Sequence, residues 1–470
     1  MILGVLLALA TLPQPAMTTA SPLSPAPEPL APAPSTPEPR ASAAPTPKAW
    51  GLARRIAFRV AFAYLFLYSL PSPVSSLPGM EFLPKAFDSV WHAVVPWVGK
   101  HVLRLGTDIT VFPNGSGDTT YNYVILPVLL AVSVLVAAVW SVVDRRRTEY
   151  DKAHDVLRVY LRYVLAISML SYGMAKVFKM QFAFPGPERM VEPLGEFSPM
   201  GLLWAFMGYS KGYNLFTGGA EMLGGFLLLA RRTTTLGALV VIGVMTNVVA
   251  LNFFYDVPVK LYSSHLLLMA VFLLLPDVQR LLGVLLLNRP TEARTLGTPF
   301  SFSRRERWGL LALKALFLVT VGWSFYEERS GFTSRYSDSA PRIELYGLYE
   351  VESFTRDGQV LPPLLGDTTR WRYVAVNRYG RVTLRMMDDS VKRFGLQHDA
   401  QKLTATLTES GGDTAKKSVL TYSRPDAEHL VFQGTFQDAL IEVRLKKVDA
   451  SKHLLVNRGF NWIQEYPFNR

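Results

Sequence analysis

Charged and amide side chains gather inside an apolar part of this chain, between Thr246 and Pro276. Asp256 and Lys260 flank the turn between two apolar runs, and His265 lies early in the second run. A charged group at the centre of a bilayer costs about 2.5–3.5 kcal/mol on insertion scales, so such groups persist where they face a bundle interior, a water-filled cavity or a ligand. The stretch therefore indicates a membrane protein and the place of a site.

A carboxylate lies deeper in the membrane sequence, because Glu221 falls between glycines in the middle of an apolar run. It must be protonated, paired or hydrated there. Two readings stay open: a proton or ligand site, and a structural pair with Lys176. If the runs 235–254 and 261–275 form a hairpin, the polar groups around the turn converge at one face of the membrane. The candidate ligand or proton residues are Lys176, Glu221, Asn247, Asn252, Asp256, Lys260, Ser264 and His265.

The same cluster has a structural alternative, in which its side chains only hydrogen-bond neighbouring helices at about 0.6 kcal/mol a pair. We assign no catalytic residue. The chain has no cysteine, which excludes disulfides and thiol chemistry within it. Its histidines show no metal-ligand spacing, so we expect no metal site. The net charge of +12 sits in short arginine clusters between apolar runs, which favours membrane topology over nucleic-acid binding.

The chain divides by composition into four parts. Residues 1–20 are apolar and signal-like, and residues 21–50 form a Pro/Ala-rich linker that cannot bury a core. Residues 51–330 hold the apolar runs, and residues 340–470 read as a β-rich domain. Runs of about 18–20 residues match the hydrocarbon thickness. The expected spans are 56–70, 123–143, 157–178, 213–230, 235–254, 261–275 and 308–325, with an amphipathic surface helix over Lys85–Leu105.

Basic residues follow the second, fourth and sixth expected spans, as at Arg145–Arg147 and Arg231–Arg232. Lysine and arginine concentrate in cytoplasmic loops. The sequence therefore predicts a cytoplasmic N-terminus and an extracytoplasmic C-terminal domain in a bacterial inner membrane.

Period-two alternation dominates the C-terminal part. Segments beginning at Leu345, Trp371, Val382, Leu403, Leu430 and Leu440 read as strands separated by Gly and Asp turns. Short strands at such spacing predict a barrel or sandwich. The opening Gly347–Val351 and the closing Arg458–Trp462 resemble a lipocalin-like barrel.

The region 155–285 resembles the DoxX family of small bacterial membrane proteins. Tyr172-Gly173-Met174-Ala175-Lys176, Gly219–Gly225, Arg231-Arg232 and Gly237 carry this resemblance. It implies a four-helix core and a redox-linked membrane subunit, since some members are similar to a subunit of thiosulfate:quinone oxidoreductase. The flanking spans, the long outer loop and the β domain depart from the family pattern.

The predicted fold is an all-α membrane bundle of about seven spans with a DoxX-like four-helix core, followed by an all-β lipocalin-like barrel. The first functional hypothesis is a subunit of a redox or quinone-linked membrane complex, with a quinone as its ligand and the bilayer and a membrane redox protein as its partners. The second is a membrane-anchored binding or transport protein that uses the external barrel. The third is a structural or assembly protein without catalysis.

Overall fold

The helical part of the chain precedes a closed sheet. The computed structural model describes residues 49–77, 79–111, 114–292, 299–336, 338, 340–409 and 416–469. The expected apolar segment 1–20 and nearly all of the linker 21–50 lie outside the described residues. The α-helices are α2 (Leu52–Ser69), α3 (Phe82–His101), α4 (Thr120–Val143), α5 (Asp151–Val177), α6 (Pro199–Tyr209), α7 (Lys211–Leu228), α8 (Thr234–Phe254), α9 (Lys260–Leu274), α10 (Val278–Leu285) and α11 (Arg304–Tyr336), with the short α12 (Leu454–Asn457) after the sheet.

Within the described residues, four helical segments are long and apolar enough to cross a membrane. They are Thr120–Val143, Thr234–Phe254, Lys260–Leu285 and Arg304–Glu327. These segments indicate a membrane protein. The expectation of seven spans is therefore wrong for the described chain.

Charged residues explain the difference, because helices form at the other three expected spans but carry too many polar groups. Arg59 of α2 is buried, and it donates to the Tyr150 hydroxyl at 3.1 Å and to the Ser141 hydroxyl at 2.6 Å. Arg162 of α5 is also buried and donates to the Leu228 carbonyl at 2.9 Å. The bundle interior satisfies these charges, so these helices need not be as apolar as a helix that faces lipid.

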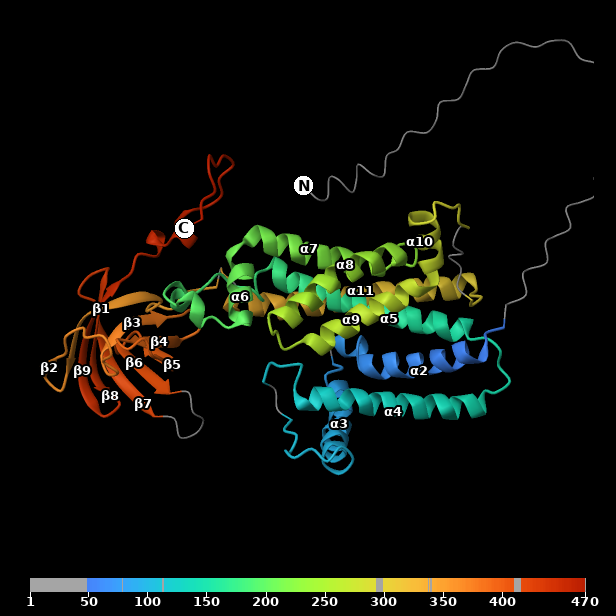
Figure 1. Ribbon diagram of the computed structural model, residues 1–470, viewed down its shortest axis with the longest axis horizontal. Helices are drawn as coiled ribbons and strands as arrows, with labels where there is room; N and C mark the ends of the chain where they lie inside the picture. The colour runs from blue at the N-terminus through green and yellow to red at the C-terminus, as the bar shows by residue number, and fades with distance from the viewer. Residues whose placement is uncertain are drawn as a thin grey trace, which may run out of the picture. The chain divides into compact units, whose positions relative to one another are not determined.

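The helices around the candidate site lie side by side. α5 contacts α7 and α9, and α8 contacts α7 and α9 (Figure 1). Gly173 of α5 and Gly218 of α7 let two backbones touch, since a Cβ on either residue would lie 2.6 Å from the carbonyl oxygen of the other. Small residues permit this close approach of helices. The crossing fixes α7 against α5 one turn from Lys176 and Glu221.

The C-terminal domain is an up-and-down antiparallel barrel. Its described strands form a nine-stranded sheet in the order β2-β1-β3-β4-β5-β6-β7-β8-β9, which closes where β1 pairs with β9. The two-residue β2 adds to one edge of β1 and lies outside the closed ring. The strands are β1 (Gly347–Arg356), β2 (Gln359–Val360), β3 (Trp371–Val376), β4 (Arg381–Met386), β5 (Val391–Asp399), β6 (Thr404–Glu409), β7 (Lys417–Ser423), β8 (His429–Phe436) and β9 (Ala439–Lys447).

Large apolar side chains fill the barrel interior. The Trp371 ring lies 5.6 Å from that of Phe354 and 5.0 Å from that of Phe436, and Phe436 lies 5.4 Å from Phe394. All four side chains are buried in a single core cluster. The interior of an eight-stranded barrel is just wide enough to be filled by side chains or to hold one small ligand, and in this barrel aromatic side chains are buried there.

The sequence predicted most of these elements but not all of them. A helix does form near the expected surface helix, as α3, and six of the expected strands are present. β2, β5 and β7 were not predicted. The expected closing strand at Arg458–Trp462 is wrong: that segment joins no sheet, and the barrel closes through β9 instead.

Candidate functional site

A cavity of about 200 Å³ opens among α5, α6, α7, α8 and α9. Apolar side chains form most of its wall, including the methionines Met169, Met207 and Met245. Methionine adapts to irregular apolar ligands because its side chain is flexible and polarizable. Polar groups from the four helices α5, α7, α8 and α9 interrupt this wall: Tyr172, Lys176, Glu221, Asn252, Tyr262 and Ser263.

An ion pair forms the deepest polar feature of the cavity wall. The Lys176 Nζ lies 2.9 Å from the Glu221 Oε2, and the two side chains are 9% and 3% exposed. Lys176 lies in the last turn of α5, and Glu221 lies at the centre of α7, beyond the glycine crossing. From the sequence, these two residues could form either a structural pair or a ligand site. The geometry shows both a pair and a position on the cavity wall.

A second polar contact lies on the opposite side of the cavity. The Asn252 amide of α8 donates to the Ser263 hydroxyl of α9 at 3.0 Å, and that hydroxyl donates to the Lys260 carbonyl at 3.1 Å. The expected hairpin of α8 and α9 is therefore present, and it carries Asn252 into the site. The contact ties the two helices together, and Asn252 lines the same cavity as Glu221.

Lys260 and Asp256 do not line the cavity. The Lys260 Nζ lies 2.9 Å from the Asp256 carboxylate, at the turn between the two helices. The start of α9 is capped from a distance: the Asp118 carboxylate accepts from the backbone N–H groups of Lys260 at 2.7 Å and of Leu261 at 3.0 Å. Val259 cannot cap the helix itself because it has no polar side-chain atom. Lys260 and Asp256 therefore pair at the turn between α8 and α9, and Asp118 caps the first turn of α9.

His265 points away from the cavity. Its Nε2 lies 2.8 Å from the Tyr64 hydroxyl, and its ring stacks on Tyr68 with centroids 3.9 Å apart. Its Nδ1 lies 2.7 Å from the Leu261 carbonyl, so Nδ1 is the donor and Nε2 the acceptor. Asn247 is exposed on α8, and Ser264 is half-buried outside the cavity lining. The structure thus brings together Lys176, Glu221 and Asn252 and separates the other five candidates from them.

Two tyrosines were missed by the sequence analysis. Tyr172 precedes Lys176 by one helical turn, and its ring centroid lies 5.9 Å from the Lys176 Nζ. The Tyr262 hydroxyl lies 3.1 Å from the Ser168 hydroxyl, and the two tyrosine rings are 6.1 Å apart. The i, i+4 step from Tyr172 to Lys176 was the available signal. In the part of the chain that the structure describes, no group of His, Asp or Glu is arranged to hold a metal ion.

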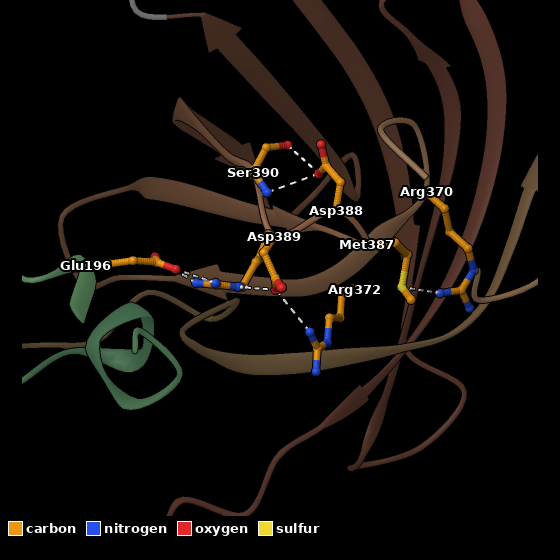
Figure 2. Close-up of polar contacts among 8 residues, drawn as sticks. Glu196, Arg370, Arg372, Met387, Asp388, Asp389 and Ser390 are labelled. Carbon is orange, nitrogen blue, oxygen red and sulfur yellow. Dashed lines mark hydrogen bonds and ion pairs between the residues drawn. The ribbon is translucent and has the colours of Figure 1, made fainter. Parts of the chain in front are cut away.

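A second polar constellation lies on the outer face of the barrel. Arg385 of β4 forms a double contact with the Glu196 carboxylate, at 2.7 and 3.1 Å, and also donates to Asp389 at 3.0 Å. Figure 2 shows Glu196, Asp389 and Arg372 converging there, and Arg372 lies 3.0 Å from Asp389. Hydrogen bonds from Arg385 lower the pKa of both Glu196 and Asp389. Since Glu196 belongs to the connection between α5 and α6, this contact joins the two halves of the chain.

The fold and cavity together define a helical membrane protein with a C-terminal β-barrel. No family model matches this chain, and no solved structure matches it. Over 123 residues the chain is 36% identical to "Uncharacterized protein YwoB" of Bacillus subtilis (strain 168), which is 26% of this chain and 78% of that protein. The chain therefore belongs to the same family as YwoB, whose name states no activity.

Proposed function

We propose that this protein is a subunit of a membrane redox complex and that its helical cavity binds the headgroup of a quinone. The carrying observation is the buried Lys176–Glu221 pair in the wall of an otherwise apolar cavity. Whole drug-sized ligands occupy pockets of about 300–1,000 Å³. A cavity of about 200 Å³ suits a single substituted ring, with an isoprenoid tail left in the surrounding lipid.

The polar groups of the cavity suit a ligand with two carbonyl oxygens. A quinone, when bound, supplies reversible uptake of two electrons and two protons, and the electrons would come from a partner protein of the complex. The Lys176 ammonium can donate a hydrogen bond to one carbonyl oxygen, and Glu221 can hold a proton at its carboxylate. The amide of Asn252 offers a further donor across the cavity. The resemblance to the DoxX family adds support from the sequence side.

The direction of the chain in the membrane follows from its basic residues. Arg145–Arg147 follow the end of one apolar helix, Arg231 and Arg232 precede the next, and Arg304 and Arg305 begin the last. We place these ends in the cytoplasm by the positive-inside rule. The barrel, which follows the other end of α11, then lies outside the cytoplasm of a bacterial cell.

The ligand-binding alternative for the barrel is weaker. The lipocalins share an up-and-down topology of consecutive antiparallel strands with this barrel. The packed rings of Trp371, Phe354 and Phe436, however, occupy the space that a ligand would need. One observation also favours a purely structural role for the helical site, because the Lys176–Glu221 pair ties α5 to α7.

The proposal can be tested by quinone binding to the purified full chain in detergent. We expect a short-chain quinone with a decyl tail to bind and Glu221→Gln to weaken it at least tenfold. Asn247→Ala is the matched control, because Asn247 is exposed on α8 and does not line the cavity. Equal affinity in the wild type and Glu221→Gln, or no binding by the wild type, would overturn the proposal. Purification from native membranes would then identify the electron donor.

A further inference from the structure

The C-terminal segment after the barrel exposes an unusual number of aromatic side chains. Phe460, Trp462, Ile463 and Tyr466 are 78%, 90%, 80% and 69% exposed. Residues 458–469 form neither helix nor strand. Phe460 and Trp462 contact each other with ring centroids 5.0 Å apart. Contiguous exposed apolar groups of this kind mark an interaction surface.

The segment starts beside the connections that lead to the helical region. After β9, the Val448 N–H donates to the Leu348 carbonyl at 2.8 Å. Val448 and His453 then line a cleft of about 550 Å³ together with Phe184 and Pro187 of the α5–α6 connection. The segment therefore leaves the barrel next to the connection that follows α5.

The segment is also long enough to reach beyond the barrel. Residues 450–452 and 454–457 are helical and rise about 1.5–2.0 Å each, whereas an extended residue covers at most about 3.3–3.6 Å, so the stretch from the end of β9 to Trp462 can span up to about 40 Å. The apolar helix α11 ends at Glu327 as a candidate span, and β1 begins at Gly347. This short connection keeps the barrel close to any membrane that α11 crosses.

We propose that residues 454–468 are an interfacial anchor that inserts into the headgroup region of the bilayer holding the four apolar helices. Tryptophan and tyrosine concentrate at membrane interfaces because one end of each ring is apolar and the other polar. Lys452 lies just before the segment and Arg458 lies within it, and both can contact anionic headgroups. The partner of this segment is therefore a lipid surface, the bilayer that holds the apolar helices of the same chain, rather than another protein.

The position of Trp462 can be measured in the full chain reconstituted into phosphatidylcholine–phosphatidylglycerol nanodiscs. Subtracting the fluorescence of Trp462→Phe from that of the wild type isolates the emission of this one side chain. The same subtraction for Trp323, inside the α11 candidate span, gives a lipid-exposed reference, and Trp371, 1% exposed in the barrel core, gives a protected one. Each is recorded with ordinary lipid and with phosphatidylcholine brominated high on its acyl chains.

The inference requires that bromine quench the Trp462 emission at least twofold, as it quenches Trp323, while Trp371 stays unchanged. A Trp462 emission that keeps its aqueous wavelength and is not quenched would overturn it. A blue-shifted but unquenched emission would overturn it as well, since a protein surface would then cover the segment. None of these outcomes depends on quinone binding, so this test and that of the proposed function fail independently.

Discussion

Removing one partner of the Lys176–Glu221 pair should destabilise the helical region strongly, and removing both should not. Breaking a buried ion pair on one side costs about 3–5 kcal/mol because the other charge stays buried and unpaired. Lys176 and Glu221 are 9% and 3% exposed, so neither can turn into bulk water. The cavity beside them allows some hydration, so we expect the low end, about 3 kcal/mol, or roughly a hundredfold in the unfolding equilibrium.

The double variant Lys176→Met/Glu221→Leu should recover most of that loss, since apolar replacements for a buried pair are often neutral or stabilising. The assay is equilibrium unfolding in mixed micelles of increasing dodecyl sulfate fraction, followed by the helical circular dichroism signal. The emission of the buried Trp371, isolated by subtracting that of the Trp371→Phe variant, reports separately on the barrel and serves as the internal control. Single variants that cost under about 1 kcal/mol would refute the reasoning that the pair is desolvated.

The same variants separate a ligand site from a structural pair. If the pair only holds α5 against α7, quinone binding should return with stability in the double variant. If the pair binds the headgroup, affinity should stay lost in the double variant although its stability recovers. A double variant that regains both stability and affinity would support the structural alternative.

Three further outcomes are expected. Asp118→Ala should cost about 1–2 kcal/mol in the same unfolding assay, because the N–H groups that begin α9 lose their cap. Gly218→Ala should cost about 1–3 kcal/mol by overpacking the crossing of α5 and α7, whereas Gly219→Ala, which has nothing within 4 Å of its new Cβ, should cost none. The Glu196 pKa is lowered from 4.5 by Arg385, so their contact is complete above about pH 4.5 and lost as the pH falls through the lowered value. The contact can be followed by the distance between two spin labels, on cysteines introduced into this cysteine-free chain, one in the α5–α6 connection and one on β5. We expect this distance to increase in acid in the wild type, and to be increased at all pH values in Arg385→Gln.

Local patterns in the sequence were enough to predict elements whose buried residues repeat with a simple period. Leu440–Leu445 alternates clearly between exposed and buried side chains and lies in β9 as predicted. β7 was missed because one of its inward positions is the polar Ser418, and β5 because Gly395 interrupts it. Inward polar groups and glycines weaken the alternation on which strand prediction depends.

The sequence by itself determined that this is a chain of apolar helices followed by a β-domain, and that charged and amide groups lie among those helices. Only the tertiary structure decided which of them meet. Lys176 and Glu221 are 45 residues apart in sequence, and their Nζ and Oε2 atoms lie 2.9 Å apart. The close approach of Gly173 and Gly218 brings them together, and this pairing of two helices cannot be predicted from either helix alone. His265, close to Ser263 in sequence, faces Tyr64 instead of the cavity. Periodicity places a side chain on a helix face, but the packing of several helices decides what that face meets.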